Sequence, residues 1–132
     1  MPHTFHADSD GPAGAAWSLL AEPSRWHEWA PHVRGAWGLG SPQVEDRRIG
    51  AARLLGVIPV PAQVVGVAPG RRWTWRVGPA LMVHAVEPRA GGGCRVSVTL
   101  SAPGPLDGLL AAVYGPVVQL TLDRLARRAG CG

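Results

Sequence analysis

Lysine is absent from this sequence of 132 residues, so all 13 of its basic residues are arginines. The arginines are scattered along the chain, and the only adjacent ones are the pairs Arg47-Arg48, Arg71-Arg72 and Arg127-Arg128. A nucleic-acid-binding domain needs basic residues gathered into a patch or stripe. Despite a formal net charge of +4 and a pI of about 10.4, we therefore expect no nucleic-acid partner.

Cysteine is scarce, and long apolar runs are missing. Cys94 and Cys131 are the only cysteines, and their number and spacing exclude both a disulfide framework and a cysteine metal site. No stretch approaches the roughly 18 uninterrupted apolar residues of a membrane-spanning helix. The first ten residues, MPHTFHADSD, lack the basic and then apolar segments of a signal peptide. We therefore expect no membrane span and a cytoplasmic location.

Motifs of well-known catalytic and cofactor sites are also missing. There is no Gly-x-Ser-x-Gly elbow, phosphate-binding loop or dinucleotide-binding fingerprint. The stretch PSRWHEWAPHV holds His27, Glu28 and His32, but the histidines are five residues apart, whereas a helical zinc pair needs a spacing of four. We predict no metal and no cofactor, while Glu28 paired with one of these histidines stays open as an acid and base.

The length and a hydrophobic fraction of 46% are typical of a single domain, which we expect to cover residues 1–132. A short strand at residues 3–7 precedes a helix that begins near Pro12 and ends at Glu22-Pro23. A second helix of one or two turns then begins at Pro23. Short Val-, Leu- and Trp-rich segments bounded by glycine and proline predict six further strands, near residues 32–39, 48–56, 62–68, 71–77, 80–87 and 94–101.

A long amphipathic helix is predicted over residues 105–129. Its apolar stripe at helical spacing consists of Leu106, Leu109, Leu110, Val113, Val117, Leu120 and Leu125. Pro116 lies inside this helix and predicts a bend, because proline removes one backbone hydrogen bond and collides with the preceding turn.

Four segments carry a family resemblance that covers nearly the whole chain. They are PAGAAWSLLAEPSRWHEWAPHV, GVAPGRRWTWRV, HAVEPRAGGGCRVSVTL and GPLDGLLAAVYGPVVQ. In this order they resemble the START-like (SRPBCC) superfamily, and in particular its polyketide cyclase/dehydrase-like members. The resemblance implies an α+β helix-grip, Bet v 1-like fold, in which a seven-stranded antiparallel curved sheet wraps around a long C-terminal helix and two short helices follow the first strand. It also implies an apolar cavity between the sheet and that helix.

Strand alternation indicates which side chains face this cavity. Trp73 and Trp75 share one face of their strand, and Thr74 and Arg76 take the other. For residues 80–87 alternation leaves both faces open, and the resemblance favours the face of His84. The candidate ligand-binding residues are Trp29, Trp73, Trp75, Met82, His84, Val98, Val113, Tyr114 and Val117.

Each candidate has a purely structural alternative. We expect Trp17 and Trp26 to belong to the core, whereas Trp29 lies where the cavity would open. His84 is either a hydrogen-bonded core histidine or a polar anchor in the cavity. Tyr114, the only tyrosine, can bring its hydroxyl to the cavity edge.

Two classes of function remain open. The first is a protein that binds a hydrophobic small molecule, either an aromatic or polycyclic compound or a lipid, with polar groups that orient it. The second is a cofactor-free polyketide cyclase or aromatase in which His84 and Tyr114 are the candidate catalytic residues. One inward histidine and no inward carboxylate favour the first class. A monomer and a homodimer are both compatible with the sequence.

Overall fold

The computed structural model describes residues 3–30, 33–40, 43–54 and 58–131, and its elements follow the predicted order. The strands are β1 (His3–Ser9), β2 (Val33–Trp37), β3 (Ile49–Leu54), β4 (Ile58–Ala68), β5 (Arg72–Val77), β6 (Ala80–Pro88) and β7 (Cys94–Ser101). The helices are α1 (Ala13–Ala21), the 3-10 helix η1 (Pro23–Glu28) and α2 (Leu106–Cys131).

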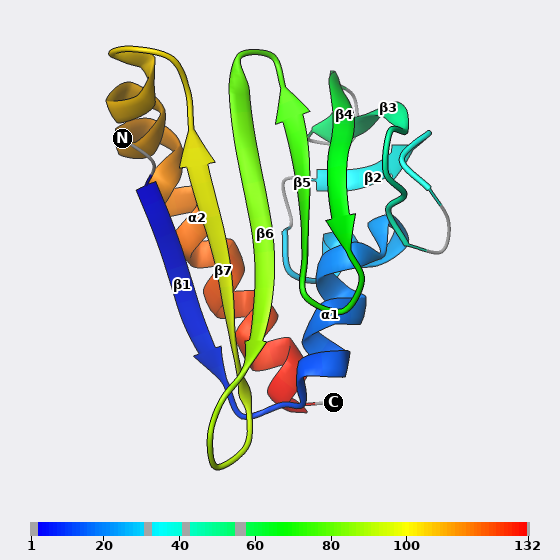
Figure 1. The fold of residues 1–132 in the computed structure, drawn as a ribbon, viewed down its shortest axis with the longest axis vertical. Helices are drawn as coiled ribbons and strands as arrows, with labels where there is room; N and C mark the ends of the chain where they lie inside the picture. The colour runs from blue at the N-terminus through cyan, green and yellow to red at the C-terminus, as the bar shows by residue number, and fades with distance from the viewer. Residues whose placement is uncertain (1–2, 31–32, 41–42, 55–57, 132) are drawn as a thin grey trace.

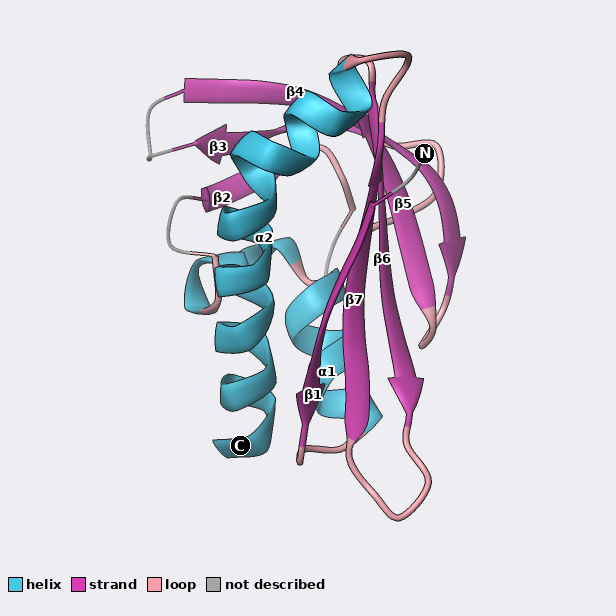
Figure 2. Ribbon diagram, turned by 90° about the vertical axis from the view of Figure 1, so that its left-hand side faces the viewer, coloured by secondary structure: helices cyan, strands magenta, loops and turns pink. Residues whose placement is uncertain are grey.

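The seven strands form one antiparallel sheet in the order β1-β7-β6-β5-β4-β3-β2 (Figure 1). From β2 to β7, each strand pairs with the next one along the chain, and β1 then joins the sheet beside β7. Figure 2 shows α2 running along one face of this sheet, with α1 nearby on the same side. The predicted helix-grip fold is thereby confirmed.

Proline determines the break between the first two helices. Pro23 has no backbone N–H, so it cannot donate to the carbonyl of Leu19 and continue α1. The last helical hydrogen bond there runs from the N–H of Glu22 to the carbonyl of Ser18, and the chain re-enters helical geometry as η1. The carbonyl groups of Leu19 and Leu20 are consequently left to find partners outside the helix.

The C-terminal helix α2 is 26 residues long, and Figure 2 shows that it is bent. Pro116 inside the helix accounts for a bend, as predicted. Among the described residues, no helix is both long and apolar enough to cross a membrane.

The predicted apolar stripe of α2 is wrong for part of its length. Leu109, Val113 and Leu120 are 60%, 69% and 55% exposed. The buried face lies about one residue further along the helix and includes Val118, Leu122, Leu125, Ala126 and Ala129. Because residues 108–122 carry no charged side chain, apolar spacing alone could not decide which side faces the sheet.

The core lies between the sheet and the helices, and alternation along β7 shows how it is built. Cys94, Val96, Val98 and Leu100 are buried, whereas the residues between them face the other side of the sheet. The end of β1 is tied to the last turns of α2, because Ser9 Oγ donates a hydrogen bond of 2.6 Å to the carbonyl of Ala126.

Candidate ligand-binding site

Two adjacent cavities lie between α2 and the sheet. The inner chamber, of about 50 Å³, is lined by Trp26, Trp29, Ala30, Trp73, Trp75, Met82, His84, Val98, Tyr114, Val118 and Thr121. The outer chamber, of about 340 Å³, is lined by Ala52, Val60, Trp75, Val77, Pro79, Ala80, Met82, Leu100, Leu106, Leu110 and Tyr114. Trp75, Met82 and Tyr114 line both chambers, so a ligand that passes these side chains can occupy the two together.

Tryptophans form much of the inner wall. The ring of Trp26 stacks on that of Trp73 with centroids 5.5 Å apart and planes 6° from parallel. Trp75 stands edge-on to both rings, at centroid distances of 5.3 and 5.4 Å. Parallel and edge-to-face arrangements are the favourable geometries for aromatic pairs, so these rings support one another as a preformed wall.

The carbonyl groups at the end of α1 that have no helical donor accept hydrogen bonds from three of the indoles in this wall. Nε1 of Trp29 donates to the carbonyl of Leu19 at 2.8 Å, which is the acceptor that Pro23 cannot serve. Nε1 of Trp26 and Nε1 of Trp73 both donate to the carbonyl of Leu20, at 2.9 and 3.1 Å. The polar ends of the three indoles are therefore satisfied at the end of the helix, and their apolar surfaces are left to line the chamber.

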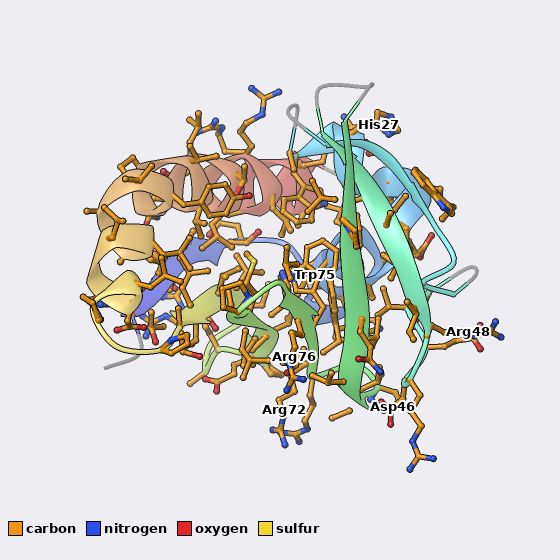
Figure 3. The ribbon with its side chains drawn as sticks, turned by 90° about the horizontal axis from the view of Figure 1, so that it is seen from above. His27, Asp46, Arg48, Arg72, Trp75 and Arg76 are labelled. Carbon is orange, nitrogen blue, oxygen red and sulfur yellow. The ribbon has the colours of Figure 1, made fainter. Side chains whose placement is uncertain are left out.

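Side chains of strand β5 point alternately into the molecule and away from it. Figure 3, a view from above, shows Trp75 pointing into the molecule, whereas Arg72 and Arg76 on the same strand point away from it. Trp73 is 1% exposed, and the two arginines are exposed. The inward orientation that alternation predicted for both tryptophans is confirmed.

His84 lies in the inner wall, directly opposite Trp73 in the pairing of β5 with β6. Its ring stacks on that of Trp73, with centroids 3.9 Å apart and planes 9° from parallel, and Nδ1 lies 3.3 Å from the carbonyl oxygen of Trp73. The side chain is 4% exposed. Burial lowers the pKa of His84 from 6.5 to about 3, so the ring is neutral at physiological pH.

Tyr114 and Thr121 bring hydroxyl groups to the inner chamber from α2. Tyr114 is partly buried, and this burial raises the pKa of its phenol above 10.0. Thr121 Oγ1 donates to the carbonyl of Val118 at 2.8 Å, within its own helix. Both hydroxyls are therefore neutral groups at physiological pH.

No described residue that lines either chamber is an aspartate, glutamate or arginine. Glu28, which the sequence left open as an acid or base, lies outside both chambers. It accepts hydrogen bonds from Arg25 and Arg128, and these lower the pKa of its carboxyl below 4.5. His32 lies outside the described residues, and within them no group of three or more metal-binding side chains occurs.

Seven of the nine candidate residues line the inner chamber, namely Trp29, Trp73, Trp75, Met82, His84, Val98 and Tyr114. The other two do not line either chamber. Val113 is 69% exposed on the outer side of α2, and Val117 is only half-buried. For these two the structure corrects the predicted position, for the same reason that it corrects the apolar stripe.

The sequence did not identify several lining residues, above all Trp26, Val118 and Thr121. Trp26 was assigned to the core alone, but it is both buried and part of the chamber wall. A signal for the helix residues was available, because Arg124, Arg127 and Arg128 mark the exposed side of α2. Leu120 lies four residues before Arg124 and Val113 eleven residues before it, so both share the exposed side of the helix with Arg124. Val118 then lies on the opposite, buried side.

Solved structures of several bacterial proteins share this fold. A protein from Thermobifida fusca superposes with a TM-score of 0.81 at 21% identity, covering 98% of this chain and 93% of its own. XoxI from Bacillus cereus gives a TM-score of 0.77 at 13% identity, covering 96% and 94%. A START superfamily protein from Mycobacterium smegmatis gives 0.68 at 13% identity, covering 96% and 97%. At these identities the likeness concerns the fold alone.

Sequence comparison identifies the family. None of the curated proteins matches the chain significantly. Residues 4–130, however, match the family described as "Polyketide cyclase / dehydrase and lipid transport". That match includes every strand from β2 to β7, nearly all of β1, and the described part of α2 up to Gly130. It agrees with the START-like fold and with an apolar cavity between sheet and helix, and the chain belongs to this family of START-like proteins.

Proposed function

We propose that this protein binds a hydrophobic, aromatic or polycyclic small molecule, with the body of the molecule in the outer chamber and one end in the inner chamber. The observation that carries the proposal is the wall of four tryptophans around a small chamber that opens beside a larger apolar one. Flat aromatic walls suit ring systems, because stacked and edge-on contacts add about 0.5 to 1.5 kcal/mol beyond the burial of area.

Binding is favoured over catalysis by the protonation states of the polar groups. General acid–base catalysis works best when a group has a pKa near the working pH. His84, with a pKa of about 3, is not an imidazolium at neutral pH, so it is no general acid there, and it is a weak base. The phenol of Tyr114 has its pKa raised by burial. These groups suit hydrogen bonding that orients a ligand, which is the role we assign to them.

Native mass spectrometry of the purified protein tests the proposal, because a co-purified ligand enclosed between α2 and the sheet would add its mass to that of the protein. Titration with Nile red, an uncharged hydrophobic dye, gives a second readout. We expect Trp26→Leu and Trp29→Leu each to weaken dye binding by about 2- to 12-fold, the loss that corresponds to one aromatic contact.

Trp17→Leu is the matched control, since Trp17 is a buried tryptophan that lines neither chamber and donates to Gln43 at 3.2 Å. It should reduce the melting temperature and leave dye affinity unchanged. Dye binding that does not respond to either Trp26→Leu or Trp29→Leu would show that these chambers are not the binding site.

A further inference from the structure

We infer that the end of the ligand that enters the inner chamber is an uncharged hydroxyl, alcoholic, phenolic or enolic, that donates a hydrogen bond to Nε2 of His84. This inference rests on the proposed function and narrows it to a class of ligand. Among the described lining residues of the inner chamber, none would pair with the charge of a fatty acid, a phosphate ester or another anion.

The tautomer of His84 follows from its partner. A carbonyl oxygen can only accept a hydrogen bond, so the contact of Nδ1 with the oxygen of Trp73 requires the proton to be on Nδ1. In the neutral ring Nε2 then carries a lone pair and no proton. The stacked contact with Trp73 and the edge contact with Trp75, at 5.8 Å, hold the ring in this orientation.

We place Nε2 at the surface of the inner chamber, because it is not fully shielded and because the buried His84 lines that chamber. Within the described residues, every side-chain nitrogen or oxygen that is fully shielded from solvent has a hydrogen-bond partner. The hydrogen bond of His84 to a described residue is made through Nδ1, so Nε2 is not among the fully shielded atoms. A polar atom that faces an apolar chamber loses hydration unless the occupant supplies a donor.

The remaining lining explains why that donor is uncharged. The described walls of the inner chamber contain tryptophans, aliphatic side chains and neutral hydroxyls, with no cation to pair with an anionic head group. An unpaired charge in such surroundings is strongly disfavoured. At about 50 Å³, moreover, the inner chamber has room for a hydroxyl group or the edge of a ring rather than for a branched head group.

Three naphthalenes of similar size test the inference on the intact protein. 2-Naphthol carries a hydroxyl donor, 2-fluoronaphthalene replaces it by a group that cannot donate, and 2-naphthoate replaces it by an anion. By calorimetric titration at pH 7.5, we expect 2-naphthol to bind about 2- to 12-fold more tightly than 2-fluoronaphthalene, the net effect of one hydrogen bond. 2-Naphthoate should bind at least about 10-fold more weakly than 2-naphthol.

The variants assign the effect to one atom. His84→Phe keeps an aromatic ring against Trp73 but removes both nitrogens, so the preference for 2-naphthol over 2-fluoronaphthalene should disappear. Trp17→Leu changes a buried tryptophan outside both chambers and should keep the preference. Loss of the preference in Tyr114→Phe together with its retention in His84→Phe would overturn the inference, because the hydroxyl would then belong to Tyr114.

The wild-type protein decides the matter if His84→Phe does not fold. A neutral, accepting His84 predicts that the ratio of the two affinities stays constant from pH 8 to pH 5.5. A fall of that ratio around pH 6.5, or binding of 2-naphthoate as tight as that of 2-naphthol, would overturn the inference while leaving the proposed hydrophobic site in place. Binding of none of the naphthalenes, together with no binding of Nile red, would overturn both.

Discussion

The C-terminal half of α2 is packed against the rest of the protein along one side, whereas the N-terminal half is packed at Gly115 and Val118 but also lines the two chambers. Leu122 and Leu125 are fully buried, and Ser9 and Glu28 bind the same region through Ala126 and Arg128. In the other half, Leu109 and Val113 are exposed, and the inward residues Leu110 and Tyr114 line the chambers.

This difference separates two requirements along a single helix. A close-packed contact stabilises the fold but leaves no room for a ligand. A chamber provides room but forgoes the packing contacts that its lining residues would otherwise make. In this protein, the C-terminal half of α2 supplies most of the packing, and the N-terminal half, together with Thr121 in the following turn, supplies the helical wall of the two chambers.

The largest effect should come from removing a side chain from the packed half. We expect Leu125→Ala to lower the free energy of unfolding by about 2 to 5 kcal/mol, because a fully buried leucine leaves a cavity when truncated. Nile red affinity should stay unchanged. Leu110→Ala removes the same atoms beside the outer chamber and should cost less stability while changing dye affinity. Equal stability losses, measured by urea unfolding, would remove the distinction between the two halves.

The pH dependence of stability sharpens the comparison at the inner chamber. The unfolded chain protonates His84 at its ordinary pKa of 6.5, whereas the folded protein resists protonation until the pH is near its pKa of about 3. The unfolded state therefore binds more protons in this window, and stability falls as the pH drops below 6.5. Between pH 7.5 and 5.0 we expect a loss of about 2 kcal/mol in urea unfolding.

The variant His84→Phe is the control for this prediction, since it should abolish most of that loss. Carboxylates such as Glu28, whose pKa is lowered by hydrogen bonds from Arg25 and Arg128, lose their contribution only below about pH 4.5 and so fall outside the window. A pH dependence that is the same in both proteins would mean that His84 is protonated in the folded state.

Pro116→Ala tests whether the bend of α2 serves the chambers. Alanine is favoured over proline in a helix interior by about 3 kcal/mol, but the folded protein is already adapted to the bend and the unfolded chain becomes less restricted. We expect a net gain of about 1 kcal/mol in thermal unfolding, together with weaker Nile red binding as the N-terminal half straightens. A variant that gains stability and keeps full affinity would show that the bend is unrelated to the site.

The smallest effect is expected on the exposed side of α2. Val113→Ala should change the free energy of unfolding by less than about 0.5 kcal/mol and leave dye binding unaltered, because its side chain is 69% exposed. The matched change Val118→Ala, in the wall of the inner chamber, should cost about 1.5 kcal/mol and alter dye affinity. If Val113→Ala weakened dye binding and Val118→Ala did not, the side of α2 that the sequence predicts, with Val113 facing the ligand, would be right.

The strands and most of the site were predictable because their signals are local. All seven predicted strands occur, with ends that differ by a few residues, since turns rich in glycine and proline bound them. Alternation along a strand has a period of two, so once one face of β5 or β7 is assigned, every other side chain follows. Trp73, Trp75 and Val98 were placed correctly on this basis.

The helical part of the site was less predictable. Where a helix is apolar on both sides, the apolar pattern does not distinguish the buried face from the exposed one. For this reason Val113 and Val117 are predicted to face the cavity although they line neither chamber. The role of Trp26 was equally hidden, because a residue can be buried among its neighbours and still contribute one surface of its ring to a chamber.

The sequence by itself determined the element order, the break at Pro23, the bend of α2 and the inward faces of β5 and β7, because each depends on residues close together in the chain. Only the tertiary structure decided how closely each half of α2 packs against the sheet and how large the two chambers are. The tertiary structure alone also forms the hydrogen bonds from three indoles to the carbonyls of Leu19 and Leu20. It likewise stacks the ring of His84 on that of Trp73. These features depend on how distant segments pack together, and the same packing, by burying His84, keeps its ring neutral.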